Sequence, residues 1–262
     1  MSAHTKAAYA ESMEQKVDAL VLRTADYREN DKIVTLFSLQ KGKISASLKG
    51  VKKAGAKLKF AAQPFCFAEY VLTGKGERNT VISAALTDGF YPLREDIGKF
   101  YAAACVLGVC DTLLFDGIVN EELFLRTVNT LKEMCVSDEA DALVSFMISA
   151  LGLSGYGLAL EHCGGCGKEL SGRMFFDLRD GCFYCSDCAK GSGASESTLH
   201  ELRKGAGMSY DESLAKSGKM RAIRLLSAYF TEKTETRVKA FAEYIPLLSQ
   251  ETRSDENSKD TV

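Results

Sequence analysis

Two cysteine pairs with the same internal spacing constrain the later part of this 262-residue chain more than any other feature. Cys163 and Cys166 form the first pair, and Cys185 and Cys188 form the second after a gap of 18 residues. A two-residue gap lets both sulfurs of a pair reach one tetrahedral ion, and two such pairs are typical of a four-cysteine zinc site. We therefore predict one Zn²⁺ ion, held in a zinc ribbon over residues 161–190.

Four thiolates would close the coordination shell, so the predicted ion is structural and offers no position to water or substrate. Two neighbours could displace one of these ligands, because Cys182 lies three residues before Cys185 and His162 directly precedes Cys163. We expect Cys182 to pack in a hairpin over residues 173–185 and His162 to be solvated. The alternatives are a segment that holds no metal or one that holds another metal.

The remaining cysteines are predicted to be ordinary packing residues. Cys66, Cys105, Cys110 and Cys135 stand singly among apolar residues, where free cysteine behaves as a small hydrophobe. The sequence contains no apolar run of the roughly 18 residues that a membrane span needs, and its first residues lack the apolar core of a signal peptide. We therefore expect a cytoplasmic protein with reduced thiols.

Residues 17–88 have the pattern of a small β-barrel. Short runs rich in β-branched and aromatic residues predict strands, and turn residues separate them. Five strands in about 70 residues suit a closed barrel better than a sandwich. The predicted strands cover residues 19–24, 32–39, 43–51, 65–72 and 80–86.

Helical periodicity begins after Pro92. It predicts helices over residues 94–115, 121–135 with Asn120 as the cap, and 138–153. After the cysteines, residues 191–197 are expected to form a loop that caps a short helix through Lys204, and helical patterns return at 218–230 and 236–245. The sequence thus predicts an α+β multidomain protein, with an N-terminal extension at 1–16, a barrel domain at 17–90, a helical domain at 91–248 and a disordered tail at 249–262.

Charge is divided unevenly along the chain. Residues 1–85 have a net charge of +6 and the remainder a net charge of −8. Eight lysines and no acidic residue lie between Asp31 and Glu69, which favours a polyanionic partner for the barrel alone. Small barrels bind single-stranded nucleic acid through cations and stacking aromatics; nearby aromatics are Tyr27, Phe37, Phe60, Phe65 and Phe67, of which at least half are expected in the core. The plainer alternative is a solvated lysine-rich loop that binds nothing.

Catalytic patterns are weak. The sequence has no G-x-x-x-x-G-K-[ST] phosphate loop, and its three histidines form no evident triad. We therefore predict that the protein is not an enzyme. A zinc-dependent nucleic-acid enzyme would require an open position on the metal, which the four-cysteine pattern does not offer.

The same segments resemble a known family, the bacterial recombination mediators called RecO. The likeness rests on residues 19–65, with the Leu22-Arg23-Thr24 strand, the Y-x-E-x-D-x-I-V-T-L-F run, the Gly-Lys turn and the lysine loop that begins at Lys49. It continues through residues 91–114, the cysteine segment 151–188 and residues 224–241. The resemblance therefore covers most of residues 17–245.

The resemblance implies an OB-fold barrel, followed by an α-helical domain with an embedded four-cysteine zinc ribbon. It implies a non-enzymatic mediator of DNA repair and homologous recombination, associated with the nucleoid. Such a protein would bind single- and double-stranded DNA and anneal it without ATP. It would also help recombinase load onto strands coated by single-strand binding protein. The expected protein partners are RecR and single-strand binding protein, and no membrane is involved.

Candidate contacts follow from matching positions. The DNA-contact candidates implied by the resemblance are Arg23, Lys32, Lys43, Lys49, Lys52 and Lys53, and charge alone adds Lys57 and Lys59. Possible contacts for the acidic tail of single-strand binding protein are Arg221, Arg224, Arg237 and Lys239. The alternative function is a scaffold that acts mainly through its protein partners and binds DNA weakly by itself.

Overall fold

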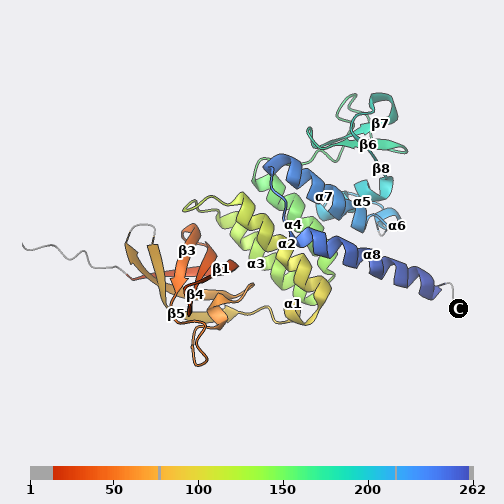
Figure 1. The fold of residues 1–262 in the computed structure, drawn as a ribbon. Coiled ribbons are helices and arrows are strands. Elements are labelled where there is room, and N and C mark those ends of the chain that lie inside the picture. The colour runs from red at the N-terminus through yellow and green to blue at the C-terminus, as the bar shows by residue number, and fades with distance from the viewer. Residues whose placement is uncertain (1–13, 76–77, 216, 260–262) are drawn as a thin grey trace, which may run out of the picture. The chain divides into compact units, whose positions relative to one another are not determined.

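The structure, a computed structural model, describes residues 14–75, 78–215 and 217–259. The chain divides into two compact units. The first contains residues 1–89 together with 116–119, and the second contains residues 90–115 and 120–262. Figure 1 colours the strands of the first unit red to orange and the helices of the second yellow to blue.

The first unit is a closed five-stranded barrel, as the sequence predicts. Its strands follow the order β1-β2-β3-β5-β4, and all neighbours are antiparallel except β3 and β5. Alternate side chains point inward, so residues such as Val17, Ala19, Val34 and Leu36 form the core. The strands are β1 (Gln15–Tyr27), β2 (Asp31–Ser38), β3 (Gly42–Leu48), β4 (Phe67–Lys75) and β5 (Arg78–Asp88).

A short segment from later in the chain also belongs to the barrel. Residues 116–119, which the sequence assigns to the helical domain, pack on the start of β3. The Gly117 N–H donates to the Lys43 carbonyl oxygen at 2.9 Å. A Cβ at Gly42 would lie 1.9 Å from the Ile118 carbonyl oxygen, so only glycine permits this approach. The assignment fails because this contact joins residues more than 70 positions apart, beyond the reach of local patterns.

The second unit is built on helices α2 (Ile97–Leu113), α3 (Glu121–Val136) and α4 (Glu139–Leu153). Asn120 and Asp138 cap α3 and α4 with side-chain oxygens, and Asn120 confirms the predicted cap. The predicted helix over 94–115 is interrupted, because Asp96 is extended and accepts a hydrogen bond from the Lys99 N–H. One short turn, α1 (Pro92–Glu95), precedes this break.

Helix α4 is the centre of the second unit. It contacts α2, α3, α5 and α7, and its buried residues, including Leu143, Val144, Phe146 and Met147, extend over more than half of its circumference. An apolar face this wide is stable only when several neighbouring helices cover it. The later helices are α5 (Glu196–Gly205), α6 (Glu212–Ala215), α7 (Lys219–Thr234) and α8 (Ala240–Lys259).

A small sheet carries part of the cysteine segment. Strands β6 (Met174–Asp177) and β7 (Cys182–Cys185) form the predicted hairpin. The prediction of a loop over 191–197 is wrong in part, because β8 (Ser192–Ala194) pairs with β6, and Ser195 then caps α5. Gly191 permits this pairing, since a Cβ there would lie 2.1 Å from the Phe176 carbonyl oxygen.

The predicted disordered tail is also corrected. Helix α8 continues to Lys259, so residues 249–259 are helical, whereas residues 260–262 lie outside the described residues. Adding residues to an existing helix costs far less than starting one, and Glu, Gln, Lys and Arg are good helix formers. The polar composition of residues 249–259 therefore did not reveal that helix α8 continues through them. The predicted extension at 1–16 overlaps β1 at its last two residues, and residues 1–13 lie outside the described chain.

Candidate metal centre and nucleic-acid surface

The four predicted cysteines come together at one point. The Sγ atoms of Cys163, Cys166, Cys185 and Cys188 all lie within 4.8 Å of one another. Cys166 Sγ and Cys185 Sγ are 3.8 Å apart. Tetrahedral ligation with metal–sulfur bonds of about 2.3 Å requires sulfurs about 3.8 Å apart. The donor set therefore fits a single tetrahedral metal ion.

Glycines and backbone hydrogen bonds position the first cysteine pair. The Gly164 N–H donates to the Phe183 carbonyl oxygen at 2.8 Å, which holds the first pair against β7. A Cβ at Gly165 would lie 2.9 Å from Cys188 Sγ, so a side chain there would displace a ligand. Gly167 has a φ of +72°, a left-handed conformation that glycine adopts readily and that turns the chain after the second cysteine.

Electrostatics at the cluster favour bound thiolate. Cys163 Sγ accepts the Cys185 N–H at 3.3 Å and the Gly165 N–H at 3.4 Å. These backbone donors, the Cys185 N–H first, lower the pKa of Cys163 to about 6. Hydrogen bonds with neighbouring cysteines, Cys166 first, raise the pKa of Cys188 to about 12. Four adjacent thiols cannot all ionise alone, and a cation removes that repulsion.

Neither alternative ligand joins the cluster. In the described part of the chain, the grouping of possible metal ligands contains the four cysteines and neither His162 nor Cys182. The His162 side chain is 57% exposed and lies 3.9 Å from Glu161. Cys182 Sγ donates to the Asp180 carbonyl oxygen at 3.4 Å. Four thiolates would fill a tetrahedral shell, so the centre is suited to holding structure rather than to activating water.

The other cysteines behave as predicted from their surroundings. Cys66, Cys105 and Cys110 are buried, and Cys135 is half-buried. Burial raises the pKa of the Cys110 thiol to about 12, so it stays protonated and unreactive at neutral pH.

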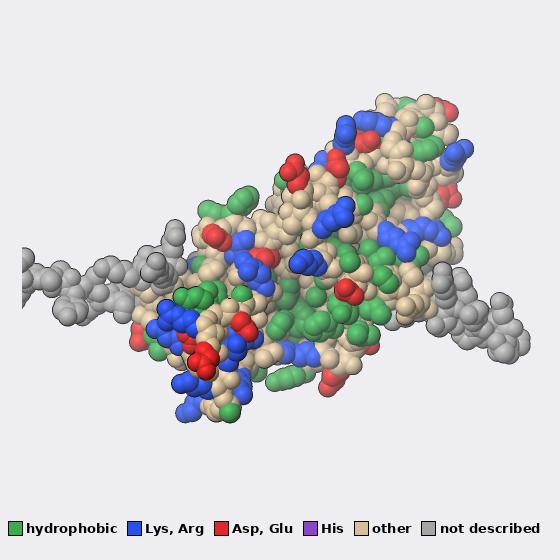
Figure 2. Space-filling view, in the orientation of Figure 1, with side chains coloured by type: hydrophobic (Ala, Val, Ile, Leu, Met, Phe, Trp, Pro, Cys, Tyr) green, Lys and Arg blue, Asp and Glu red, His purple; other side chains and the backbone are tan. Residues whose placement is uncertain are grey.

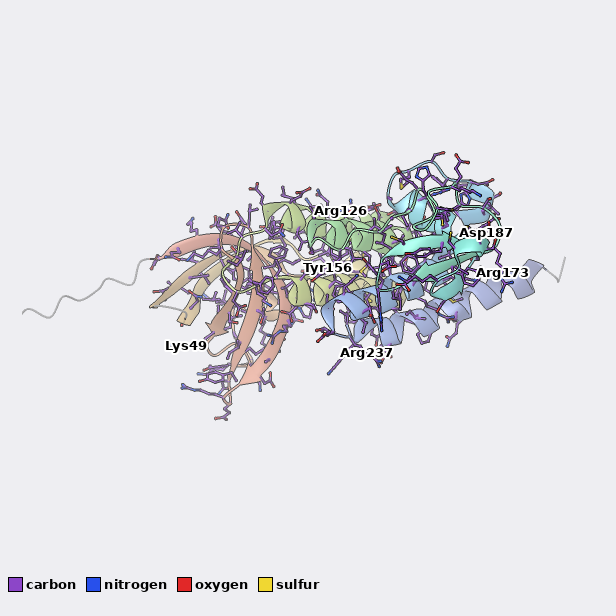
Figure 3. All side chains as sticks on the ribbon, turned by 90° about the horizontal axis from the view of Figure 1, so that it is seen from above. Lys49, Arg126, Tyr156, Arg173, Asp187 and Arg237 are labelled. Atoms are coloured by element: carbon purple, nitrogen blue, oxygen red, sulfur yellow. The ribbon has the colours of Figure 1, made fainter. Side chains whose placement is uncertain are left out.

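The fold gathers most of the predicted DNA contacts at one end of the barrel. Strand β2 supplies Lys32, and the long connection from β3 to β4 supplies the others. A hollow of about 370 Å³ is lined by Lys32, Lys52 and Lys59. A second hollow, of about 480 Å³, is lined by Lys49 and Lys53. Figure 2 shows blue side chains concentrated at this end of the barrel, and Lys49 is labelled in Figure 3.

Three predicted contacts lie outside these hollows. Arg23 is exposed on β1, and Lys57 is exposed on the β3–β4 connection. The Lys43 side chain is only 17% exposed and lies 3.9 Å from Asp116. Lys43 is therefore the candidate whose charge is least accessible to a large polyanion.

Acidic residues also line the two hollows. The Asp26 carboxylate lies 3.0 Å from Lys52 Nζ and 3.9 Å from Lys32 Nζ. Its hydrogen bond with Lys52 lowers the pKa of Asp26. Glu29 and Asp31 line the second hollow. Sequence reasoning missed these partners because it treated residues 32–68 as an acid-free block, whereas antiparallel pairing of β1 with β2 places Asp26 opposite Lys32.

The predicted aromatics divide between core and surface. Phe37 and Phe65 are buried, and Phe60 and Phe67 are half-buried. Tyr27 is 41% exposed, and the Arg28 guanidinium lies 5.2 Å from the centre of its ring. Among the five predicted aromatics, Tyr27 is thus the one that presents its ring to solvent.

Three of the four candidate tail contacts line one hollow on the second unit. Arg224, Arg237 and Lys239 border a volume of about 810 Å³ between α7 and α8, with Phe241 and Ile245 among its apolar residues. Figure 3 labels Arg237 at this site. The fourth candidate lies elsewhere, because the Arg221 guanidinium donates to the hydroxyls of Ser195 and Ser197.

Both units match one protein family. The family described as "Recombination protein O N terminal" matches residues 13–90, and "Recombination protein O C terminal" matches residues 94–240. The two matches cover most of the chain and follow one another in the expected order. This chain belongs to the recombination protein O family. The matched C-terminal region includes all four clustered cysteines and the α7–α8 hollow up to Lys239.

Curated relatives within this family are named "DNA repair protein RecO". The relative from Desulforamulus reducens is 34% identical over 175 residues, which are 66% of this chain and 68% of the relative. The relative from Desulfitobacterium hafniense (strain DSM 10664 / DCB-2) is 30% identical over 228 residues, 83% of this chain and 84% of the relative. A relative from Bacillus pumilus is 29% identical over 175 residues, 66% and 68% of the two chains.

Membrane-spanning helices need both length and apolar character. Within residues 14–75, 78–215 and 217–259, no helix combines the length and apolar character that crossing a bilayer requires.

Proposed function

We propose that this protein is a non-enzymatic mediator of DNA repair and homologous recombination. In this role it binds single- and double-stranded DNA through the cationic end of its barrel. The observation that carries the proposal is the gathering of Lys32, Lys49, Lys52, Lys53 and Lys59 at one end of a closed barrel, in a chain that belongs to the recombination protein O family.

The mechanism we propose is electrostatic. Lysines that contact phosphates release condensed counterions, so affinity falls steeply as salt rises. A cationic surface that holds two strands together also lowers their mutual repulsion, and base pairing then supplies the sequence recognition. Neither step consumes a nucleotide. Annealing without ATP is therefore the activity that this surface can support.

We further propose that the four cysteines hold one Zn²⁺ ion. Zinc favours tetrahedral thiolate ligation, and the arrangement of the four sulfurs suits it. When bound, the ion would neutralise the thiolates and join the Cys163–Gly167 turn to the end of β7. The residues around it would then maintain the fold of the ribbon and take no part in a reaction.

A different surface, on the second unit, is proposed for a protein partner. We propose that the α7–α8 hollow receives the acidic tail of single-strand binding protein, because Arg224, Arg237 and Lys239 line it and suit the carboxylates of an acidic peptide. Arg237→Glu should weaken binding of that tail peptide at least tenfold, whereas Lys168→Glu, on the ribbon, should not. Equal binding by both variants would contradict this placement. RecR is the other expected partner, and recombinase is helped indirectly.

One observation favours the alternative of a scaffold with weak intrinsic DNA binding. Asp26, Glu29 and Asp31 line the same hollows as the lysines and reduce the positive potential there. On this alternative, partners would bring DNA to the protein.

Annealing tests the proposal. Two complementary strands, each coated with single-strand binding protein, are mixed with the purified full chain without nucleotide. We expect acceleration that declines as salt rises. A folded, metal-loaded protein that gives no acceleration, yet binds single-strand binding protein tightly, would favour the scaffold instead.

A further inference from the structure

A bulge in β1 changes which of its residues point outward. The pairing of β1 with β2 shifts register between Val21 and Arg23. Val17, Ala19 and Val21 belong to the core before the bulge. After it, Thr24 pairs with Val34, which is a core residue. Because side chains alternate along a strand, Arg23, Ala25 and Tyr27 then share the opposite, outward face.

Ala25 forms the middle of this outward row. Ala25 pairs with Ile33, and Ile33 pairs in turn with Ser47 on β3. Ala25 is exposed and Ser47 is half-buried. Arg23 and Tyr27 are separated by about 13 Å, the length of four residues of extended strand. Along β1 the face therefore presents a cation at one end, an aromatic ring at the other and the small side chain of Ala25 between them.

The ring of Tyr27 also adjoins the cationic hollow. Arg28, with its guanidinium 5.2 Å from the ring centre, lines that hollow together with Lys49 and Lys53. The next turn residues are tied to the lysine loop, because the Lys52 N–H donates to the Asn30 carbonyl oxygen at 3.0 Å. Arg28 itself has a φ of +55°, a conformation that non-glycine residues adopt rarely and that functional sites often retain.

We propose that Tyr27 is a stacking platform for an unpaired nucleobase. The single strand would cross the outer face of β1, β2 and β3, with its phosphates near Arg23 and Lys49. Every base has a π-face, so stacking tolerates any sequence. In a duplex both faces of a base are covered, so this residue would favour single strands. The inference rests on the proposed DNA binding and assigns strand preference to one side chain.

The second unit offers a matched control. Tyr91 is 63% exposed, and the Arg94 guanidinium lies 6.0 Å from the centre of its ring. The pair thus reproduces the exposed tyrosine and the neighbouring arginine of the barrel. Its sequence neighbours Glu95 and Asp96 are acidic, so this site offers no net electrostatic attraction to a phosphate backbone.

The test compares a thymidine oligomer with an oligomer of the same length that carries phosphates and abasic sugars. Tyr27→Ala should weaken binding of the thymidine oligomer roughly 5- to 100-fold and leave binding of the abasic oligomer unchanged. Tyr27→Phe keeps the ring and should bind both as wild type does, as should Tyr91→Ala. The chain contains no tryptophan, so Tyr27→Trp adds a single tryptophan whose fluorescence the thymidine oligomer should quench and the abasic oligomer should not.

Three results would overturn the inference. Tyr27→Ala could bind the thymidine oligomer as tightly as wild type, or it could lose affinity equally for both oligomers, which would indicate a general effect on the surface. The tryptophan could remain unquenched by a bound thymidine oligomer. Failure of the wild-type chain to bind either oligomer would be a different result, because it would remove the proposed DNA binding itself.

Discussion

The four-cysteine centre and the lysine-rich end of the barrel are both concentrations of charge, but they neutralise that charge differently. At the cysteine centre, four sulfurs lie within 4.8 Å of one another and face inward to a common point. At the barrel, the lysines face solvent, and Asp26 neutralises only some of them. Four thiolates that face one point are neutralised by a single bound metal ion, whereas lysines that face solvent remain available to a polyanion. A cluster of charged side chains therefore does not by itself indicate a binding surface. Charges that face one another suit a metal ion, and charges that face solvent suit a large partner.

The largest expected effect tests the closed centre. Cys163→Ser should abolish zinc binding and lower the melting temperature by about 10 °C or more, because a metal-dependent segment loses its folding energy with the ion. Metal analysis and thermal unfolding measure the two effects. Cys182→Ser removes a neighbouring thiol outside the cluster and should keep one zinc ion and the wild-type melting temperature. A stable Cys163→Ser protein without zinc would contradict the structural role.

A buried carboxyl in the helical unit sharpens the comparison, because burial itself favours its neutral form and no metal ion or polyanion is needed. Glu201 on α5 is 1% exposed, and burial raises its pKa from 4.5 to about 7, against the opposing effect of Lys204. As pH rises from 4.5 to 7, the unfolded chain releases this proton while the folded chain retains it. The contribution of Glu201 to the free energy of unfolding is therefore fully present below pH 4.5 and is lost as the pH rises through about 7.

The corresponding variant is Glu201→Gln, which keeps the shape of the protonated side chain. Relative to wild type, its free energy of unfolding should be about 2 kcal/mol higher at pH 8 and should differ little at pH 4.5. Denaturant titrations at the two pH values measure the difference. A variant with the same relative stability at both values would show that Glu201 does not titrate in this range.

The smallest effect tests the open surface. Asp26→Asn removes the carboxylate that neutralises Lys52 and Lys32, so DNA affinity at low salt should rise severalfold. Glu69→Gln is the control, since it also removes one negative charge but frees Lys16, which lines neither hollow. Filter binding or fluorescence anisotropy would compare them. Equal gains in the two variants would mean that net charge matters and the position of Asp26 does not.

Local sequence patterns predicted the cysteine centre and the strands of the barrel. Spacing identified the cysteine centre well, because a metal–sulfur bond length limits how far apart its ligands can be. The strands of the barrel were equally predictable, since alternation and turn residues act over short distances. Caps such as Asn120 followed from the same local chemistry.

Contacts between distant segments could not be predicted in this way. The pairing of β8 with β6 and the packing of Ile118 against Gly42 depend on the assembled fold. The acidic neighbours of the lysines were missed for the same reason, because Asp26 lies opposite Lys32 across a strand pair. The bulge after Val21, which turns Tyr27 outward, likewise has no local sequence signal.

The most direct test of the open surface is the salt dependence of DNA binding by the full chain. Lys49→Ala/Lys52→Ala/Lys53→Ala should reduce the slope of log affinity against log salt by about two for single strands while leaving the melting temperature unchanged. A control that removes three cations from the other unit, Lys132→Ala/Lys168→Ala/Arg173→Ala, should keep the wild-type slope. If the first variant binds with an unchanged slope, the lysines at the end of the barrel do not contact DNA.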